Sequence, residues 1–197
     1  MFSGIIEAVG QLTLLTRSGV DARARIATGT LDLSDVCPGD SIAVNGVCLT
    51  VATLDAGGFH ADLSAETLQC TTFSRLTSGS MLNLEKSVTP VTRLSGHLVS
   101  GHVDGTATLL VRETIGQSLR LSLKAPDALA KYIAEKGSIC IDGVSLTVNA
   151  VNGCAFEVNL VPHTLQATTL TTLAVGDSVN IEVDMIARYL ERLHTCR

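Results

Sequence analysis

Short apolar runs recur every 8 to 14 residues along most of the chain, and turn-forming Gly, Asn, Asp and Ser residues separate them. Within the runs, apolar and polar residues often alternate, as in Leu119, Leu121 and Leu123, which enclose Arg120 and Ser122. Alternate side chains of a strand point to opposite faces, so this pattern is typical of half-buried β-strands. The chain is predicted to be an all-β protein with many short strands.

Only two segments have the spacing of helices. Residues 127–136 begin with Asp127, contain strong helix formers and are followed by Gly137, which predicts a helix over that range. In residues 185–197, apolar side chains recur at helical spacing between charged ones, at Ile186, Tyr189, Leu190 and Leu193. This apolar stripe packs either on the same chain or on another subunit, and the pattern favours neither.

The pattern of strands occurs twice. Residues 41–51 match residues 138–148 at an offset of 97, and the same offset aligns residues 66–72 with residues 163–169. About two dozen of about a hundred aligned positions are identical without a gap, whereas chance would give about five or six. Repetition of this extent indicates a tandem duplication.

The duplication divides the chain into residues 1–97, residues 98–184 and an unmatched tail, residues 185–197. Strands at this spacing in about 95 residues favour a small antiparallel barrel, because closure removes exposed strand edges. The predicted fold is therefore two tandem barrels with short helices and a C-terminal helix.

Composition narrows the choice of partner. Of the 197 residues, 46% are apolar and only 3% are aromatic, with no Trp, and the formal net charge is −5. A protein that stacks nucleic-acid bases needs aromatic platforms and a basic surface, so we expect a small molecule or another protein as partner, and no nucleic acid. The sequence has no secretory signal and no run of 18 apolar residues, which predicts a cytoplasmic protein without a membrane segment.

Cysteine spacing and glycine motifs give no sign of a metal or a cofactor. Six cysteines occur without a C-x-x-C pair or a histidine at zinc-finger spacing: Cys37, Cys48, Cys70, Cys140, Cys154 and Cys196. In a cytoplasmic protein we expect reduced thiols, most of them small buried apolar side chains. The chain also lacks the glycine motifs of nucleotide sites and the serine elbow of hydrolases, so no cofactor is predicted.

Positions at which the two repeats differ are candidates for chemistry, because shared residues serve the fold or a shared ligand. In the Asn/Asp-Gly-Val-X-Leu-Thr-Val segment, X is Cys48 in the first half and Ser145 in the second. Alternation puts Cys48 and Thr50 on the strand face opposite Val47 and Leu49, which favours a pocket wall. An ordinary core thiol is the alternative for Cys48.

Two histidines, His97 and His102, lie five residues apart in a Gly/Ser-rich stretch, and His102 aligns with Ile5 of the first repeat. Histidine titrates near neutral pH, which suits proton transfer. Three interpretations are open: a metal site, structural histidines with hydrogen-bond partners, or catalytic or ligand-contacting residues. The spacing suits neither one helix face nor one strand face, and no Cys or carboxylate completes a cluster nearby, so a metal is the least favoured.

Together these segments resemble the alpha-type riboflavin synthase family, which consists of two lumazine-binding repeats. The resemblance extends over essentially all 197 residues. It is carried by residues 1–7, 45–51, 96–105, 136–137 and 142–148 and by both Thr-Leu-Gln segments. It implies two six-stranded antiparallel Greek-key barrels, a C-terminal helix and a homotrimer, with lumazine synthase as a candidate partner.

The implied reaction is a dismutation. Two molecules of 6,7-dimethyl-8-(1-D-ribityl)lumazine exchange a four-carbon unit and give riboflavin and 5-amino-6-ribitylaminouracil, the last step of riboflavin biosynthesis. Such a reaction needs two copies of one molecule in two similar pockets, which a duplicated binding domain provides. One copy donates and the other accepts, so the pockets must differ chemically. In the family, the productive pair lies between the first barrel of one subunit and the second barrel of a neighbour.

The resemblance also implies the residues of each pocket. The first pocket is expected to contain Gly4, Ile5, Ile6, Cys48, Leu49, Thr50, Asp62, Leu63, Ser64, Ala65, Glu66 and Thr67. The second is expected to contain Gly101, His102, Val103, Lys136, Ser145, Leu146, Thr147, Leu160, Val161, Pro162, His163, Thr164 and Leu165. The threonines suit hydrogen bonds to ribityl hydroxyls and ring carbonyls, and Lys136 suits the charge of a deprotonated lumazine.

The catalytic candidates are Cys48, His97, His102, Ser145 and Thr147. We expect His102, with Ser145 or Thr147, to help remove a proton from the acidic 7-methyl group of the donor lumazine. Cys48 is expected to assist at the acceptor, as a nucleophile or by placing a water.

The competing function is an antenna protein that binds lumazine or flavin without catalysis. Relatives of that kind depart from the pattern in the second-half histidine segment and its polar pocket residues. This chain has His97, His102, Lys136 and Ser145 together with Cys48, so the synthase is favoured.

Overall fold

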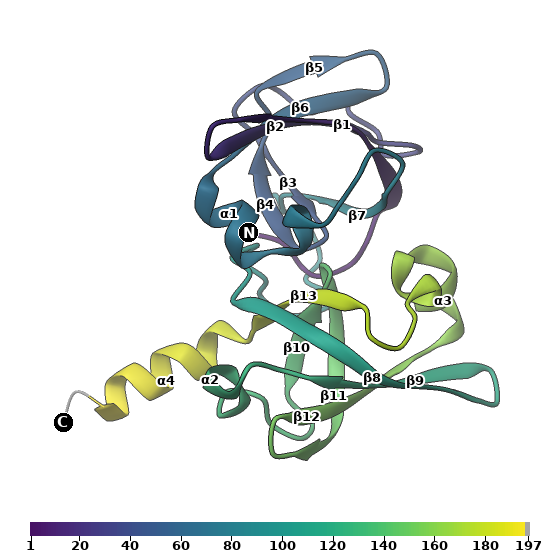
Figure 1. Ribbon diagram of the computed structural model, residues 1–197, viewed down its shortest axis with the longest axis vertical. Helices are drawn as coiled ribbons and strands as arrows, with labels where there is room; N and C mark the ends of the chain where they lie inside the picture. Colours follow the sequence, from purple (N-terminus) through teal and green to yellow (C-terminus); the bar gives the residue numbers. More distant parts are fainter. Residues whose placement is uncertain (196–197) are drawn as a thin grey trace.

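A seven-stranded sheet, a closed six-stranded barrel and a protruding C-terminal helix make up the structure, a computed structural model that describes residues 1–195 (Figure 1). Because its strand order matches that of the closed barrel, we call the seven-stranded unit the first barrel and the closed one the second barrel. The first barrel contains β1 Ala8–Ser18, β2 Asp21–Ala27, β3 Ser41–Val44, β4 Val47–Thr50, β5 Thr53–Asp55, β6 Gly58–Leu63 and β7 Met81–Lys86, with α1 Ala65–Cys70. The second contains β8 Gly105–Ile115, β9 Ser118–Lys124, β10 Ser138–Ile141, β11 Val144–Asn152, β12 Ala155–Leu160 and β13 Ser178–Val183, with α2 Asp127–Ala130 and α3 Pro162–Ala167. α4 Met185–Thr195 follows, and the predicted all-β fold with tandem antiparallel sheets is confirmed.

The strand order is the same in both halves, with one interruption in the first. The second sheet is a closed barrel in the order β10-β11-β12-β9-β8-β13, and pairing of strands that are not consecutive, such as β9 with β12, is typical of a Greek key. The first sheet has seven strands, β4-β3-β7-β1-β2-β6-β5. Its extra strand arises because the segment that matches β11 bends after Thr50 and resumes at Thr53, where β11 itself has a bulge. The expected six strands are thus found in the second barrel only.

Matching hairpin turns bring the two barrels together. Asn45-Gly46 joins β3 to β4 and Asp142-Gly143 joins β10 to β11, with positive φ at all four residues. Asn, Asp and Gly tolerate this backbone better than other residues, and such turns fit the twist of paired strands. A Cβ on Gly46 would lie 2.7 Å from the backbone nitrogen of Gly143, so the two turns touch.

Aliphatic side chains fill both barrels, as the alternating pattern predicts. Leu119, Leu121 and Leu123 of β9 are buried in the second core, together with Phe156. Phe59 of β6 has the corresponding role in the first core. A third, smaller cluster lies between the barrels and joins Phe2, Ala43, Val99 and Cys140.

The opening segment of each repeat packs on the opposite barrel. Ile6 contacts the core of the second barrel, whereas Val103, its match at the offset of 97, contacts the core of the first. The two segments pair with each other through Phe2 and Val99, whose backbone groups exchange hydrogen bonds of 2.7 and 3.1 Å. Each barrel is therefore completed by a segment from the other half of the chain.

Two matching asparagines add polar contacts between the barrels. Asn83 of β7 donates to the carbonyl oxygen of Asp142 at 2.9 Å and accepts the N–H of Thr169 at 2.8 Å. Asn180 of β13 makes the matching pair of hydrogen bonds to the first barrel, both at 2.8 Å. Because both side chains are fully buried, these bonds satisfy groups that would otherwise be costly to bury.

The prediction of a helix over residues 127–136 is wrong in length. α2 ends at Ala130. Two tight turns follow, in which the backbone N–H groups of Tyr132 and Ile133 donate to the carbonyl oxygens of Leu129 and Ala130. The N–H of Lys136 donates to the carbonyl oxygen of Val148 in β11 at 2.8 Å, and its φ is 65°. The segment therefore leaves the helix through turns, and its end at Lys136 is held by β11 and not by a helical hydrogen bond.

The predicted tail helix is present as α4, which points away from the second barrel (Figure 1). Its polar side is anchored: Glu191 bonds to Lys131 and Tyr132, and Arg188 pairs with Asp104. Its apolar stripe is exposed, at Ile186, Tyr189, Leu190 and Leu193. Residues 196 and 197, and hence Cys196, lie outside the described part of the chain. None of the helices in residues 1–195 is both long and apolar enough to cross a membrane.

Candidate ligand-binding and active site

The polar face of the repeated strand points outward from each barrel. In β4, Val47 and Leu49 are in the first core, whereas Cys48 is half-buried and Thr50 is exposed. β11 has the same arrangement, with Ser145 half-buried and Thr147 exposed. The matched faces that carry Cys48 and Ser145 are therefore outer walls of the barrels.

A cavity of about 300 Å³ lies beside Cys48. We call it the first-barrel pocket, and it is lined by Val47, Cys48, Ser64, Glu66, Thr67, Cys70, Thr71, Gly101, His102 and Val103. A thiol, an imidazole and several hydroxyls meet there, which are groups suited to proton transfer and to hydrogen bonds with a polar heterocycle. The sequence analysis gave Cys70 no role in a pocket, because position alone does not show that the end of α1 faces β4.

The start of α1 orders one wall of this pocket. Ser64 is the N-cap, and its hydroxyl accepts the N–H of Thr67 at 3.2 Å. Asp21 of the neighbouring strand accepts the N–H of Ala65 at 3.0 Å. The helix therefore begins at a fixed place and presents Glu66 and Thr67 to the pocket.

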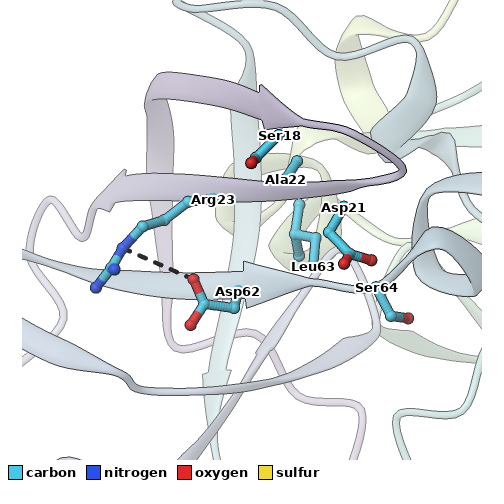
Figure 2. A pocket seen from close by; sticks show the side chains of 7 residues that line it. All are labelled: Ser18, Asp21, Ala22, Arg23, Asp62, Leu63 and Ser64. Atoms are coloured by element: carbon cyan, nitrogen blue, oxygen red, sulfur yellow. Dashed lines mark ion pairs between the residues drawn. The ribbon is translucent and has the colours of Figure 1, made fainter.

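A second cavity, of about 540 Å³, adjoins the first and shares Ser64 with it. Figure 2 shows its lining side chains, which are Ser18, Asp21, Ala22, Arg23, Asp62, Leu63 and Ser64. Arg23 and Asp62 form an exposed ion pair of 3.7 Å at its edge. The expected stretch of residues 62–67 thus spans two neighbouring cavities, and the smaller one holds the reactive groups.

Segments 4–6 and 101–103 are exchanged relative to the expected pockets. The carbonyl oxygen of Gly101 accepts the N–H of Cys48 at 2.8 Å, so His102 and Val103 lie at the first-barrel pocket. The carbonyl oxygen of Gly4 accepts the N–H of Ser145, also at 2.8 Å. The opening segments cross over, so residues 101–103 lie beside the first wall and Gly4 beside the second.

Ser145 has a histidine partner. Nδ1 of His97 lies 2.7 Å from its Oγ, and burial lowers the pKa of His97, partly offset by the charges of Asp184 and Glu182. Lys136 is exposed, and its backbone bond to Val148 places it near Thr147. The other expected members of the second pocket follow β12 into α3: Val161, Pro162, His163, Thr164 and Leu165, all at least partly exposed.

Several expected contact residues are part of the cores or lie elsewhere. Leu49, Leu146 and Leu160 point into the barrels, so their side chains do not face an outer pocket. Ile5 is exposed on another cavity, lined by residues of the segment that joins the barrels. Alternation along a strand predicts the inward direction of the leucines, whereas the position of Ile5 follows from the crossing of the segments.

Two buried glutamates hold the crossing segments, a role that the sequence analysis missed. Glu85 accepts the N–H and hydroxyl of Ser3 at 2.7 and 2.6 Å. Glu182 makes the matching bonds to Ser100, both at 2.6 Å. Burial raises the pKa of Glu85, although these hydrogen bonds lower it in part. The signal was in the sequence, because the two glutamates are matched positions of the repeat.

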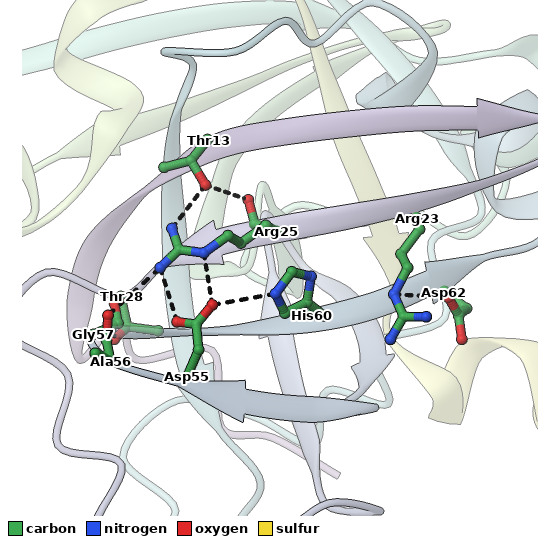
Figure 3. A network of polar contacts seen from close by, with 9 residues as sticks. All are labelled: Thr13, Arg23, Arg25, Thr28, Asp55, Ala56, Gly57, His60 and Asp62. Atoms are coloured by element: carbon green, nitrogen blue, oxygen red, sulfur yellow. Dashed lines mark hydrogen bonds and ion pairs between the residues drawn. The ribbon is translucent and has the colours of Figure 1, made fainter.

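A polar network on the outer face of the first barrel serves the fold. Arg25 binds both carboxylate oxygens of Asp55 at 2.7 and 2.8 Å, and Asp55 also contacts His60 at 3.1 Å (Figure 3). The guanidinium of Arg25 lowers the pKa of Asp55. The network ties the short β5 to β2 and β6, which gives His60 a structural role. Across residues 1–195, no three His, Cys, Asp or Glu side chains are grouped closely enough to hold a metal ion.

The geometry defines a class of protein: a duplicated β-fold in which each half has a matched outer wall, with Cys48 on one and Ser145 on the other. The family description that matches the chain is the lumazine binding domain, found at residues 3–87 and again at residues 100–184. A solved structure of LumP with 6,7-dimethyl-8-(1'-D-ribityl)lumazine is similar, with a TM-score of 0.84 and 26% identity over 93% of this chain and 99% of that one.

Riboflavin synthases are more similar in sequence. The enzyme of Photobacterium phosphoreum is 51% identical over 98% of this chain and 88% of its own length. That of Mycobacterium bovis is 44% identical over 98% of both chains. The chain belongs to the riboflavin synthase family, as the resemblance predicted, and this family consists of transferases.

Proposed function

We propose that the protein converts two molecules of 6,7-dimethyl-8-(1-D-ribityl)lumazine into riboflavin and 5-amino-6-ribitylaminouracil. The observation that carries this proposal is the pair of matched outer walls that differ in one reactive group, a thiol at Cys48 and a hydroxyl at Ser145. Two copies of one substrate fit two related sites, and the difference between the sites lets one copy donate and the other accept.

We propose that each wall binds one lumazine. The first uses the first-barrel pocket, with Thr50 and Thr67 as hydrogen-bond partners of the ribityl chain. The second uses the wall around Ser145 and Thr147, with Thr164 of α3 and the cation of Lys136 near the ring. The crossing of the opening segments supports adding His102 and Val103 to the first site and Gly4 and Ile6 to the second.

His102 and Cys48 are the proposed acid–base and acceptor-side groups. Because the two lumazines face one another in the productive pair, groups at the edge of one pocket reach both molecules. His102 is exposed at that edge and takes the proton released by the 7-methyl group, leaving the carbanion that attacks the second ring. Cys48 assists addition at the acceptor as a nucleophile or by placing a water.

A homotrimer is proposed as the active form, with each productive pair between the first barrel of one subunit and the second barrel of a neighbour. The exposed apolar stripe of α4 supports this, because its polar side is already anchored on the second barrel. Location in the cytoplasm and association with lumazine synthase are proposed on the family resemblance alone.

Incubation of the purified protein with lumazine alone tests the function. We expect riboflavin and the aminouracil in equal amounts, one of each for every two lumazines consumed. The similarity to LumP favours a non-catalytic antenna as the second candidate. Stable bound fluorescence without riboflavin would support the antenna and contradict the synthase.

A further inference from the structure

His97 is placed beside Ser145 by two close backbone approaches. A Cβ on Gly96 would lie 2.7 Å from the Cβ of Ser145, and a Cβ on Gly4 would lie 2.6 Å from it. The N–H of His97 donates to the carbonyl oxygen of Ser3 at 3.1 Å, which fixes the backbone next to the ring. Ser145 is thus enclosed by two glycines and one imidazole.

The first barrel has only part of this arrangement. Gly101 approaches Cys48 as closely as Gly4 approaches Ser145, since an added Cβ would again lie 2.6 Å away. Within residues 1–195, however, the thiol of Cys48 has no hydrogen-bonded imidazole like the one on Ser145. The two walls therefore differ in the reactive group, and they differ again in whether an imidazole is hydrogen-bonded to that group.

The surroundings of His97 indicate which nitrogen carries the proton. The side chain is more than nine-tenths buried, and its Nε2 has no hydrogen-bond partner. Burial lowers the pKa of His97, so the ring is neutral and has a single N–H. A buried N–H without an acceptor is rarer than a buried acceptor without a donor, which places the proton on Nδ1, facing Ser145.

We propose that His97 is a positioning residue that donates its Nδ1–H to Ser145 Oγ and so directs the Ser145 hydroxyl proton toward the lumazine bound at the second barrel. This rests on the proposed function and adds to it a reason why the two sites treat one molecule differently. The second site offers a fixed O–H donor, whereas the first offers the weak S–H donor of Cys48. His97 itself need not touch the substrate.

Substitution by two residues of similar size separates positioning from packing. Asn in place of His97 keeps an N–H donor near the position of Nδ1, whereas Leu has nearly the same volume and no donor. We expect His97→Asn to retain most of the turnover, and His97→Leu and Ser145→Ala each to lower kcat by about tenfold. The double variant His97→Leu/Ser145→Ala should lose no more than either single variant, because both remove the same interaction.

The outcomes distinguish this proposal from the proposed function. Wild-type protein that makes no riboflavin would contradict the function itself. If the wild type is active, two results would overturn the role of His97. One is an equal loss of kcat in His97→Asn and His97→Leu, and the other is an additive loss in the double variant. If the Leu variant does not fold, ¹⁵N NMR of histidine-labelled wild-type protein reports the tautomer directly. A proton on Nδ1 supports the proposal, and a proton on Nε2 overturns it.

Discussion

Single residues carry the chemical difference between two nearly identical barrels. Cys48 and Ser145 occupy the same place on the same strand of the repeat, and a different histidine lies beside each. The first site combines a thiol with the exposed His102, whereas the second combines a hydroxyl with the buried His97. A fold that treats both halves alike thus supports two different chemical roles.

Substitutions in the first-barrel pocket test its part in turnover. Cys48→Ser and His102→Gln should each lower kcat by about tenfold or more, because they remove the acceptor-side group and the proton acceptor. Steady-state assays of riboflavin formation measure this, and Cys37→Ser is the control because Cys37 is an exposed thiol that does not line the pocket. Near-normal rates for both pocket variants, with intact oligomers, would exclude these residues from the chemistry.

Asp142 should make stability depend on pH. It occupies the place of Asn45 in the other barrel, and burial raises its pKa from 3.8 to about 7, although the N–H of Asn180 lowers it in part. A carboxyl whose pKa is raised in the folded state contributes to stability in full below its unfolded-state pKa. This contribution to the free energy of unfolding is lost as the pH rises through about 7. Between about pH 5 and 8.5, the free energy of unfolding should fall by about 2 to 3 kcal/mol more in the wild type than in Asp142→Asn.

Urea unfolding at both pH values measures this difference. The comparison of wild type with Asp142→Asn cancels the contributions of other titrating groups. The reverse substitution, Asn45→Asp, should introduce a similar dependence in the first barrel. Equal pH dependence in wild type and Asp142→Asn would show that Asp142 is ionised in the folded protein across the range.

Among the elements, the crossing segments have the greatest influence on the sites. Residues 1–7 and 98–104 leave their own repeats and form part of the opposite wall, with Gly101 on Cys48 and Gly4 on Ser145. Each pocket therefore needs both halves of the chain. Changes to these short segments should affect binding as strongly as changes to the strands they cover.

Gly101→Ala tests the close approach of one segment. A methyl group there would meet Cys48 at 2.6 Å, and φ is already +79°. Gly57→Ala is the matched control, because its φ is +82° and nothing lies within 4 Å. Both variants experience backbone strain, but Gly101→Ala should be less stable by a further ~2 kcal/mol and bind lumazine more weakly. Equal unfolding free energies would show that the segment moves away without cost.

Elements with a strong local pattern could be predicted, and elements set by distant contacts could not. The strands, the duplication and α4 follow from alternation, a fixed offset and one apolar stripe. The helix over residues 127–136 was predicted too long because the N–H of Lys136, at its expected end, donates to Val148 of β11, a tertiary contact that the local pattern does not show. The placement of residues 4–6 and 101–103 beside the opposite walls could not be predicted, because no local signal shows that these segments cross.

At the scale of the whole molecule, the apolar stripe of α4 is left uncovered by the chain's own residues 1–195. Deletion of residues 185–197, or Leu190→Asp within the stripe, should give monomers that bind lumazine with little turnover. Val91→Asp is the control, because Val91 is an exposed apolar residue of the segment between the barrels. Sedimentation velocity measures the assembly, and a truncated protein that remains trimeric would count against the role of the helix.

The central claim is that two identical molecules react in two related sites of one protein, and isotope mixing tests it most directly. An equal mixture of unlabelled lumazine and lumazine labelled with ¹³C at the two ring carbons and two methyl groups of the exchanged unit is converted completely. Each riboflavin should then combine one unit from a donor with one from an acceptor. Mass spectrometry should show about half of the product with four labelled carbons and about a quarter each with none or eight. Riboflavin without the mixed species, or no riboflavin, would contradict the account.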